Sequence, residues 1–311
     1  MYARRVAEEL IAVVATPEER VARDRLTHAE WGQRLTIPAF VEREERLRCT
    51  PFAAAGMRTW LLVPRHDRGQ VLASLETFRV RSRHDAVCGW SYEVASVYTE
   101  PALRGRRHAS QLLGRVIAAC SDAQAFTLYS DVGEELYARA GFQARPAWDL
   151  VLSAGRATVT GVVRGDDATA LLAGRAWEGR YALVPESAQL GWHRERERIY
   201  AEKLGRRPVE HAVLTIEDGH ALLAGDLKNE RLYILDLVAG SPDALHRLVD
   251  ASRDEAALAE LGEVVVWETP ALAGRLDARR TPRDGALPML RPLLPGLDAS
   301  QWREIPRLLW V

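Results

Sequence analysis

A short basic turn between a strand-like segment and a helix-like segment most constrains what this chain of 311 residues can form. Residues 90–98 are rich in β-branched and aromatic side chains, which is typical of a β-strand. Leu112, Leu113, Val116 and Ile117 have the spacing of one helix face. A strand, a tight turn and a helix N-terminus bring backbone N–H groups and the positive end of a helix dipole together. The segment therefore predicts a binding site for a multiply charged anion.

Basic side chains are concentrated at this turn. Arg104, Arg106, Arg107 and His108 surround the predicted helix start, and a guanidinium holds phosphate oxygens in a fork. Cations at a helix N-terminus are disfavoured by the dipole, so the cluster indicates a bound anion such as a diphosphate. The alternative is an ordinary basic helix start.

The charge of the whole chain is balanced, with 42 Lys and Arg, 43 Asp and Glu, and a net charge of -1. We therefore expect no nucleic acid and no membrane surface as a partner. Residues 10–15 are too few for the apolar part of a signal peptide, and no segment approaches the length of a membrane span. The three cysteines lack metal-ligand spacing, so we expect free thiols, no metal and a cytoplasmic location.

The periodicity along the chain indicates an α/β fold with a mixed sheet. Thr16, Pro17 and Glu19 form the signature of a helix start. The first half predicts strands at 9–15, 58–64, 71–80, 90–98 and 125–130, and helices at 16–30, 38–47, 111–119 and 134–139. The second half predicts helices at 168–178, 190–204 and 241–258, and strands at 210–216, 220–226, 231–238 and 263–268.

Two motifs carry a resemblance to a known family. Arg104-x-x-Arg107-x-Ala109 is similar to the Arg/Gln-x-x-Gly-x-Gly/Ala motif of the GNAT N-acetyltransferase superfamily, with Arg107 at the position of the central glycine. Residues 136–142 resemble the closing helix-to-strand segment of that superfamily. The sequence most closely resembles the fungal-type lysine N-acetyltransferases, through residues 95–99, 104–105 and 128–131.

The resemblance implies a GNAT fold with a mixed, mostly antiparallel sheet in residues 1–152. Residues 153–311 repeat the β-β-β-α-β order and predict a second, degenerate GNAT-like α/β domain. Asp243 at its helix start would repel a diphosphate, so we expect no cofactor there. Residues 302–311 finish in a strongly apolar end, and we expect this C-terminal tail to pack back onto the body of the protein.

The resemblance also implies acetyl-CoA as cosubstrate. Ser96, Val97 and Tyr98 would pair with its amide arm through an exposed strand edge, whereas the alternative is a fully paired central strand. The basic turn would hold the diphosphate through Arg104, Gly105, Arg106, Arg107, His108, Ala109 and Ser110.

Three residues are candidates for acid and base catalysis. Tyr137 stands where the family has the general acid that protonates the departing thiolate; the alternative is a core tyrosine. Glu93 is the first choice as general base, although the strand glutamate of histone-type relatives would fall at Ser91. The alternative for Glu93 is a solvated glutamate, and Glu76 and Asp131 are further candidates.

The C-terminal carboxylate of Val311 is a competing base, because some two-domain relatives place their C-terminus in the active site. The alternative is a tail that is docked for stability alone.

The predicted function is transfer of an acetyl group from acetyl-CoA to the primary amine of a small molecule, by direct attack in a ternary complex. We expect the amine to bind between the two halves, and free lysine is named on the family resemblance alone. The alternative is a catalytically silent acyl-CoA-binding or interaction module. Nothing in the sequence indicates an oligomeric state.

Overall fold

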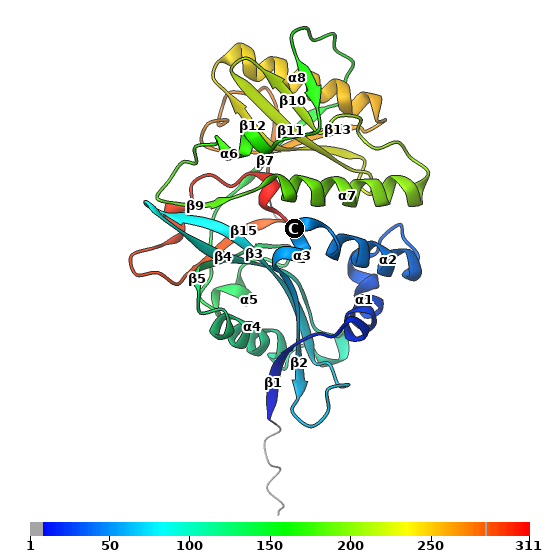
Figure 1. The fold of residues 1–311 in the computed structure, drawn as a ribbon, viewed down its shortest axis with the longest axis vertical. Helices are drawn as coiled ribbons and strands as arrows, with labels where there is room; N and C mark the ends of the chain where they lie inside the picture. The colour runs from blue at the N-terminus through cyan, green and yellow to red at the C-terminus, as the bar shows by residue number, and fades with distance from the viewer. Residues whose placement is uncertain (1–8, 284) are drawn as a thin grey trace, which may run out of the picture.

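Two mixed β-sheets, one in each half of the molecule, form the framework of the computed structural model (Figure 1). The structure describes residues 9–283 and 285–311. The first sheet has the order β1 (Leu10–Val14), β2 (Met57–Pro64), β3 (Ala73–His84), β4 (Val87–Tyr98), β5 (Ala123–Ser130), β15 (Leu287–Pro292) and β6 (Gln143–Ala144), with β9 (Tyr181–Val184) also paired to β3. The second has the order β14 (Arg279–Pro282), β7 (Trp148–Ser153), β13 (Glu263–Trp267), β12 (Arg231–Ala239), β11 (Gly219–Asp226), β10 (Val213–Ile216) and β8 (Val163–Gly165).

The helices cover the sheets and fill the junction. The longer ones are α1 (Pro17–Trp31), α2 (Ile37–Arg48), α4 (His108–Ala119), α7 (Ser187–Leu204) and α8 (Pro242–Leu258), and the short ones are α3 (Pro51–Gly56), α5 (Glu135–Ala138), α6 (Thr169–Ala173), η1 (Pro101–Leu103), η2 (Ala299–Gln301) and η3 (Arg307–Leu309). Helix α4 packs on the first sheet and α8 on the second. Helix α7 contacts α2 and α3 on one side and β11 on the other, so it lies between the halves (Figure 1).

The predicted capping box starts α1 as expected. The Thr16 N–H donates to the Glu19 carboxylate at 2.7 Å, and the Glu19 N–H donates to the Thr16 hydroxyl at 3.3 Å. These bonds satisfy backbone groups that the first helical turn leaves without partners. The expected helix at 168–178 is wrong beyond Ala173, because Gly174 ends it and Arg175 binds Asp236 and Glu304.

The two halves repeat one arrangement. In each half three antiparallel strands lead to a helix and then to a strand that pairs in parallel with the third: β2–β3–β4–α4–β5 and β10–β11–β12–α8–β13. A helix is a usual connection between two neighbouring parallel strands. The remaining ladders are antiparallel. The mixed, mostly antiparallel sheet predicted for the first half is therefore confirmed, and the second sheet has the same character.

Each sheet is completed by a strand from the other half. Strand β15, near the C-terminus, pairs with β5 of the first sheet, whereas β7 pairs with β13 of the second sheet. The expected boundary between residues 152 and 153 lies within β7, and β9 and β15 lie beyond it although both pair with strands of the first sheet. The periodicity of the sequence does not reveal this exchange of strands between the sheets, because strand pairing is a long-range contact.

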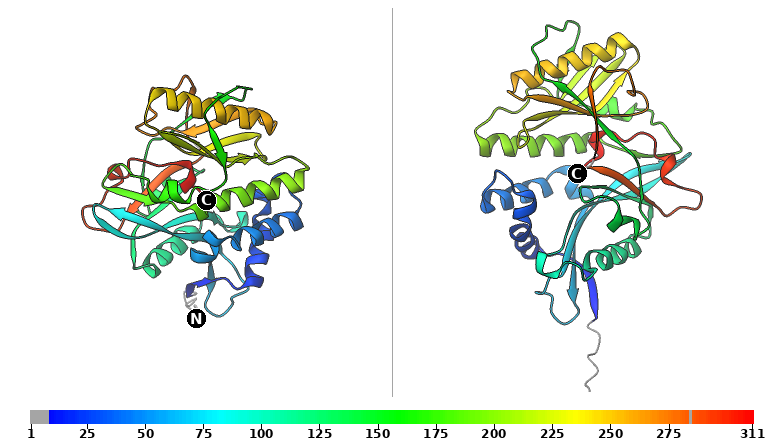
Figure 2. Two further views of the ribbon diagram at one scale, coloured as in Figure 1. Left: turned by 45° about the horizontal axis from the view of Figure 1, so that its top comes forward. Right: turned by 180° about the vertical axis from the view of Figure 1, so that it is seen from behind.

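The apolar C-terminal tail packs against the body, as expected. Trp302, Leu308 and Leu309 are fully buried, and Tyr181 and Trp302 form an isolated β-bridge. Both views in Figure 2 place the C-terminus between the two halves.

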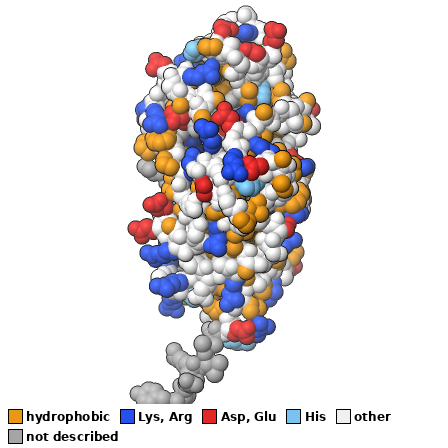
Figure 3. All heavy atoms as spheres, turned by 90° about the vertical axis from the view of Figure 1, so that its left-hand side faces the viewer, with side chains coloured by type: hydrophobic (Ala, Val, Ile, Leu, Met, Phe, Trp, Pro, Cys, Tyr) orange, Lys and Arg blue, Asp and Glu red, His pale blue; other side chains and the backbone are white. Residues whose placement is uncertain are grey.

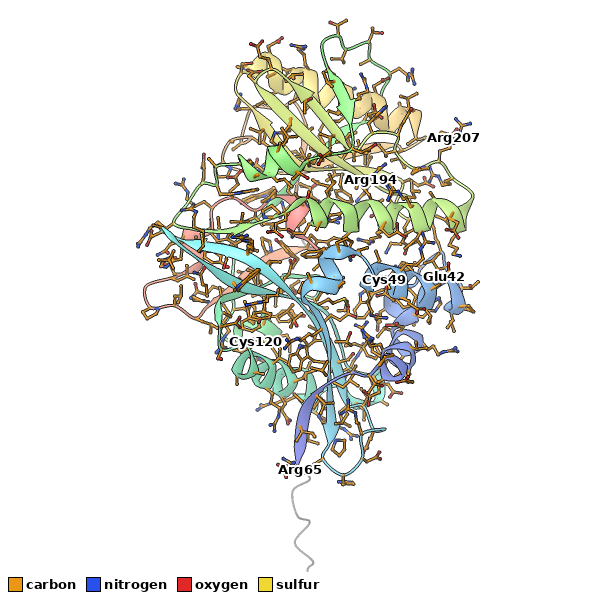
Figure 4. All side chains as sticks on the ribbon, in the orientation of Figure 1. Glu42, Cys49, Arg65, Cys120, Arg194 and Arg207 are labelled. Carbon is orange, nitrogen blue, oxygen red and sulfur yellow. The ribbon has the colours of Figure 1, made fainter. Side chains whose placement is uncertain are left out.

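The surface carries charges of both signs, and the cysteines, all of which the structure describes, are not joined in disulfides. Basic and acidic side chains are interspersed on the face shown in Figure 3. Cys49 and Cys120 lie on different parts of the first half (Figure 4), and they and Cys88 are free thiols. Within the described residues no helix is long and apolar enough to cross a membrane, and no group of three or more His, Cys, Asp or Glu side chains is arranged to bind a metal.

Candidate active site

Strand β4 carries a bulge at the expected position of the cosubstrate arm. Its register with β3 runs from Glu76 opposite Ala95 to Ser74 opposite Tyr98, so β4 contains one extra residue there. Ser96 adopts a left-handed conformation with φ of 52°, which costs a non-glycine residue about 1–2 kcal/mol. Such a bulge bends the strand and redirects its peptide groups.

Beyond the bulge, β4 separates from β5. The parallel pairing between them ends at Val94 opposite Leu128, although β4 continues to Tyr98. Strand β5 is paired on its other side with β15. The edge of β4 over residues 95–98 is therefore open toward β5, which agrees with the predicted exposed edge and not with a fully paired central strand.

A cavity of about 650 Å³ lies at this opening, between the two halves. The first half contributes Glu93, Ser96, Val97, Tyr129, Asp131 and Tyr137 to its wall, the second half contributes Trp192, Lys228, Tyr233 and Trp267, and the tail contributes Arg307, Trp310 and Val311. The cavity thus brings together all three predicted catalytic residues. Its size suits a small molecule, since ligand pockets measure about 300–1,000 Å³.

Glu93 is buried in this wall and is not a solvated glutamate. Its side chain is 1% exposed, and neither carboxylate oxygen has a hydrogen-bond partner among the described residues. Burial raises the pKa of Glu93 well above its ordinary value. The Val311 N–H and the Arg307 guanidinium act in the opposite direction, but the Val311 amide does not form a hydrogen bond of good geometry. Glu93 therefore retains its proton to higher pH than an exposed glutamate does.

The other carboxylates proposed as bases differ in environment. Glu76 lines the cavity, but Arg23 donates to it at 2.9 Å and Arg48 lies 3.4 Å away. Asp131 lies at the exposed end of β5. Ser91, the position of the strand glutamate in histone-type relatives, is buried between the hydroxyls of Ser82 and Tyr181 and does not line the cavity.

Tyr137 is both a core residue and part of the cavity wall. Helix α5 holds it, and its ring meets that of Phe142 edge to face at 6.1 Å. Burial raises the pKa of its phenol, with a further contribution from Asp131. A phenol with a raised pKa remains protonated at neutral pH, which is the state that a proton donor requires.

The basic turn leads from β4 to α4 as predicted, but it lies outside the cavity wall. Arg104, Arg106 and Arg107 are exposed. Arg104 donates to Glu30 at 2.7 Å and to the Thr99 carbonyl at 3.1 Å. His108, Ala109 and Ser110 form the first turn of α4.

Arg107 lies immediately before the first turn of α4. It is the N-cap residue of α4 and adopts a left-handed conformation, with φ of 63°. Glycine adopts this conformation without a steric penalty, which explains why the corresponding motif position is a glycine. Gly105, with φ of 82°, retains that freedom in the same turn.

Among the cavity residues that the sequence analysis did not name, Tyr129 and Arg307 have the most distinctive environments. Tyr129 lies on β5, and its buried hydroxyl has no hydrogen-bond partner among the described residues. Arg307 lies in the apolar tail, 7% exposed, with its guanidinium over the rings of Tyr233, Trp267 and Trp310. Tyr129 belongs to residues 128–131, which carry part of the family resemblance but suggested no role for its hydroxyl. Arg307 has no local signal, since an arginine near a chain end is usually a surface residue.

Comparison with known proteins identifies the fold. Residues 173–287 match the model of a family described as the LYC1 GNAT-like C-terminal domain. The chain is similar to a solved GCN5-related N-acetyltransferase from Kribbella flavida, with 21% identity, a TM-score of 0.59 and coverage of 94% of this chain and 73% of that chain. A second such protein, from Anabaena variabilis, has 14% identity, a TM-score of 0.59 and coverage of 91% and 72%.

A third, from Sphaerobacter thermophilus, has 15% identity, a TM-score of 0.52 and coverage of 94% and 98%. No curated protein sequence matches the chain. The likenesses extend over both halves, so the chain has the GNAT fold, with a GNAT-like second half as the sequence predicted.

Proposed function

We propose that the protein transfers an acetyl group from acetyl-CoA to the primary amine of a small molecule, by direct attack in a ternary complex. The observation that carries the proposal is the convergence of Glu93, Tyr137 and the open edge of β4 on one cavity. A base, an acid and backbone donors are the groups that acyl transfer to an amine requires.

Two features of the first half fit acetyl-CoA as cosubstrate. The open edge of β4 at residues 96–98 offers backbone groups to an amide-containing arm. The α4 N-terminus, with Arg106, Arg107 and His108, offers a positive dipole end and cations to a diphosphate. Neither Arg106 nor Arg107 forms an ion pair within the described residues, so both guanidiniums are available.

Each residue then has a defined task. Glu93 accepts the proton that the substrate ammonium must lose before its nitrogen attacks the thioester carbonyl. As the C–N bond forms and the C–S bond breaks, Tyr137 donates its proton to the departing thiolate. The second proton, which the nitrogen loses as it becomes an amide, restores the Tyr137 phenol. The Val311 carboxylate is the competing base, because the tail brings the C-terminus to the same wall. The approach of an ammonium would lower the pKa of Glu93 and favour its ionised form.

The shape and charge of the cavity support a small acceptor. The second half closes one side through Lys228, Tyr233 and Trp267, which leaves a partly open cavity rather than the flat surface that would suit a folded protein. Arg307 faces the cavity without a carboxylate partner within hydrogen-bond distance among the described residues, and this supports an amine that also carries an anionic group. Free lysine meets that description and is the first acceptor to assay.

One observation favours a second function, a catalytically silent acyl-CoA-binding or interaction module. Arg107 occupies a left-handed position that suits glycine, so the turn is strained at the point that would hold the diphosphate.

Two measurements separate these functions. Isothermal titration with acetyl-CoA tests binding, and thiol release with a panel of amino acids, polyamines and folded proteins tests transfer. We expect binding and turnover with a small amine. Binding without turnover would favour the silent module, and turnover with folded proteins alone would contradict the small acceptor.

A further inference from the structure

We propose that Arg23 is a positioning residue of the acyl-transfer site: it holds the bulge of β4 and thereby orients the Val97 N–H. The inference rests on the proposed function, because it assigns this N–H to the carbonyl oxygen of the thioester. Arg23 belongs to α1 and is far in sequence from β4, so neither motif of the chain includes it.

Arg23 contacts both strands at the bulge. Its Nη2 donates to the Ser96 carbonyl at 3.0 Å, its Nη1 to the Glu76 carboxylate at 2.9 Å and its Nε to the Ser74 hydroxyl at 3.4 Å. Ser74 and Glu76 are the two residues of β3 between which the register shifts, and Ser96 is the left-handed residue of β4. One planar guanidinium therefore spans the irregular part of the ladder.

The position of this guanidinium is itself fixed. Arg23 is 3% exposed, and its guanidinium lies 5.7 Å from the centre of the Trp31 ring. Asp24, the next residue, receives two bonds of 2.6 Å from Arg48, which anchors this part of α1 to α2. A side chain held from several directions supplies a rigid donor, as an exposed arginine would not.

The contact with the Ser96 carbonyl determines where the next N–H points. The described residues contain no cis peptide bond, and in a trans peptide the C=O and N–H point in opposite directions. The Ser96 carbonyl points to Arg23, so the Val97 N–H points away from α1. Donation to the carbonyl also polarises the peptide group and strengthens its N–H as a donor. The orientation and the polarisation of the Val97 N–H both favour its donation to the thioester carbonyl oxygen, on which negative charge develops during acyl transfer.

The test compares Arg23→Met with the same substitution at a second buried arginine, which lies outside the cavity wall. Arg194 on α7 (Figure 4) is also buried and also donates to a carboxylate, that of Glu197, and to a backbone carbonyl, that of Val209 at 2.7 Å. It does not line the cavity. Arg194→Met should therefore reproduce the loss of a buried ion pair without disturbing β4.

We expect Arg23→Met to lower kcat at least tenfold while the KM for acetyl-CoA changes less than about threefold, since small misplacements of reacting groups reduce rates by such factors. Arg194→Met should keep kcat within about threefold at a similar loss of Tm. Arg23→Lys retains the charge but cannot span the three contacts, so it should also lower kcat. It keeps the test decisive if the methionine variant fails to fold.

Infrared difference spectroscopy of bound acetyl-CoA labelled with ¹³C at the carbonyl gives a second measurement. We expect a shift of the carbonyl stretch to lower frequency in the wild type and a smaller shift in the Arg23 variants. Equal shifts, or kcat values that follow Tm alone in all variants, would overturn the inference while leaving the proposed function intact. If the wild type does not bind acetyl-CoA, the proposed function fails and this inference fails with it.

Discussion

Glu93 combines two properties that oppose each other in a folded protein. Its carboxylate is almost fully buried, yet no described group forms a hydrogen bond with it. Burial without a partner destabilises the ionised form, whereas a general base must be ionised to accept a proton. Such a conflict between stability and chemistry is common at functional sites.

The first prediction tests this conflict. The folded state raises the pKa of Glu93, so the unfolded chain ionises first and wild-type stability falls as the pH rises above the ordinary glutamate range. Glu93→Gln cannot ionise and should escape this loss. We expect its Tm to exceed that of the wild type by about 1–4 °C at pH 8 and by less at pH 5, while turnover falls roughly 10²-fold.

Glu76→Gln is the matched control for stability. Its carboxylate is paired with Arg23 and Arg48, so the same substitution should lower Tm. A Tm for Glu93→Gln below that of the wild type at pH 8 would contradict the assignment of an unpaired carboxyl.

The second prediction concerns the hydroxyl of Tyr137. Tyr137→Phe keeps the ring packed against Phe142 and removes only the proton. We expect turnover to fall by roughly 10²–10⁴ with little change in acetyl-CoA affinity. In Tyr92→Phe, the control, the lost hydroxyl binds Asp122 at 2.9 Å outside the cavity, so turnover should remain. Wild-type rates in Tyr137→Phe would leave Tyr137 a core residue alone.

At the scale of elements, the turn between β4 and α4 carries both charge and strain. Three exposed arginines precede the helix N-terminus, where the dipole disfavours them unless an anion binds. Arg107 also adopts a left-handed conformation. The helix dipole and the backbone conformation both disfavour an arginine at position 107. A function that requires the Arg107 side chain, such as anion binding, explains why it is there.

The third prediction separates these two contributions. Replacing Arg104 and Arg107 together with alanine removes charge-assisted contacts of about 1.5–3 kcal/mol each, so acetyl-CoA affinity measured by titration should fall at least tenfold. Arg107→Gly relieves the backbone and should keep or raise Tm while weakening binding less than the double variant. Arg207→Ala, at an exposed position of the second half (Figure 4), is the control. An unchanged dissociation constant in the double variant would remove the diphosphate site from this turn.

At the scale of the whole molecule, the halves exchange strands and share the cavity. Strand β7 completes the second sheet and β15 the first, so neither sheet is complete without both parts of the chain. The tail then passes from β15 through η3 to the cavity wall. The exchange therefore places the C-terminus beside Glu93.

The fourth prediction tests the tail. Deleting Trp310 and Val311 removes a ring that lies 3.8 Å from the Arg307 guanidinium, together with part of the cavity wall. We expect turnover to fall while acetyl-CoA affinity is unchanged, because the basic turn and β4 edge remain. Tm reports the contribution of the tail to stability.

A one-glycine extension after Val311 distinguishes the side chains from the carboxylate, since it keeps the former and moves the latter. Lost turnover in the extended chain would assign the base to Val311, and retained turnover would assign it to Glu93. Full activity after the deletion would leave the tail a structural role.

The sequence by itself determined the features that depend on neighbouring residues. Thr16 and Glu19 predicted the start of α1, the apolar spacing of residues 112–117 predicted α4, and β-branched residues predicted β4. The order of these elements and the motif around Arg104 were sufficient for the fold class, because caps, turns and periodicity are local signals.

Only the tertiary structure decided which elements meet. The exchange of β7 and β15, the burial of Glu93, the contact of Arg23 with Ser96 and the place of Arg307 in the wall all join residues far apart in sequence. Alternation of apolar and polar residues along a strand indicates that one face is buried, but it does not identify the element that packs on that face. The cavity is lined by residues that come together only when the two halves pack against each other. Which residues line it was therefore decided by tertiary packing.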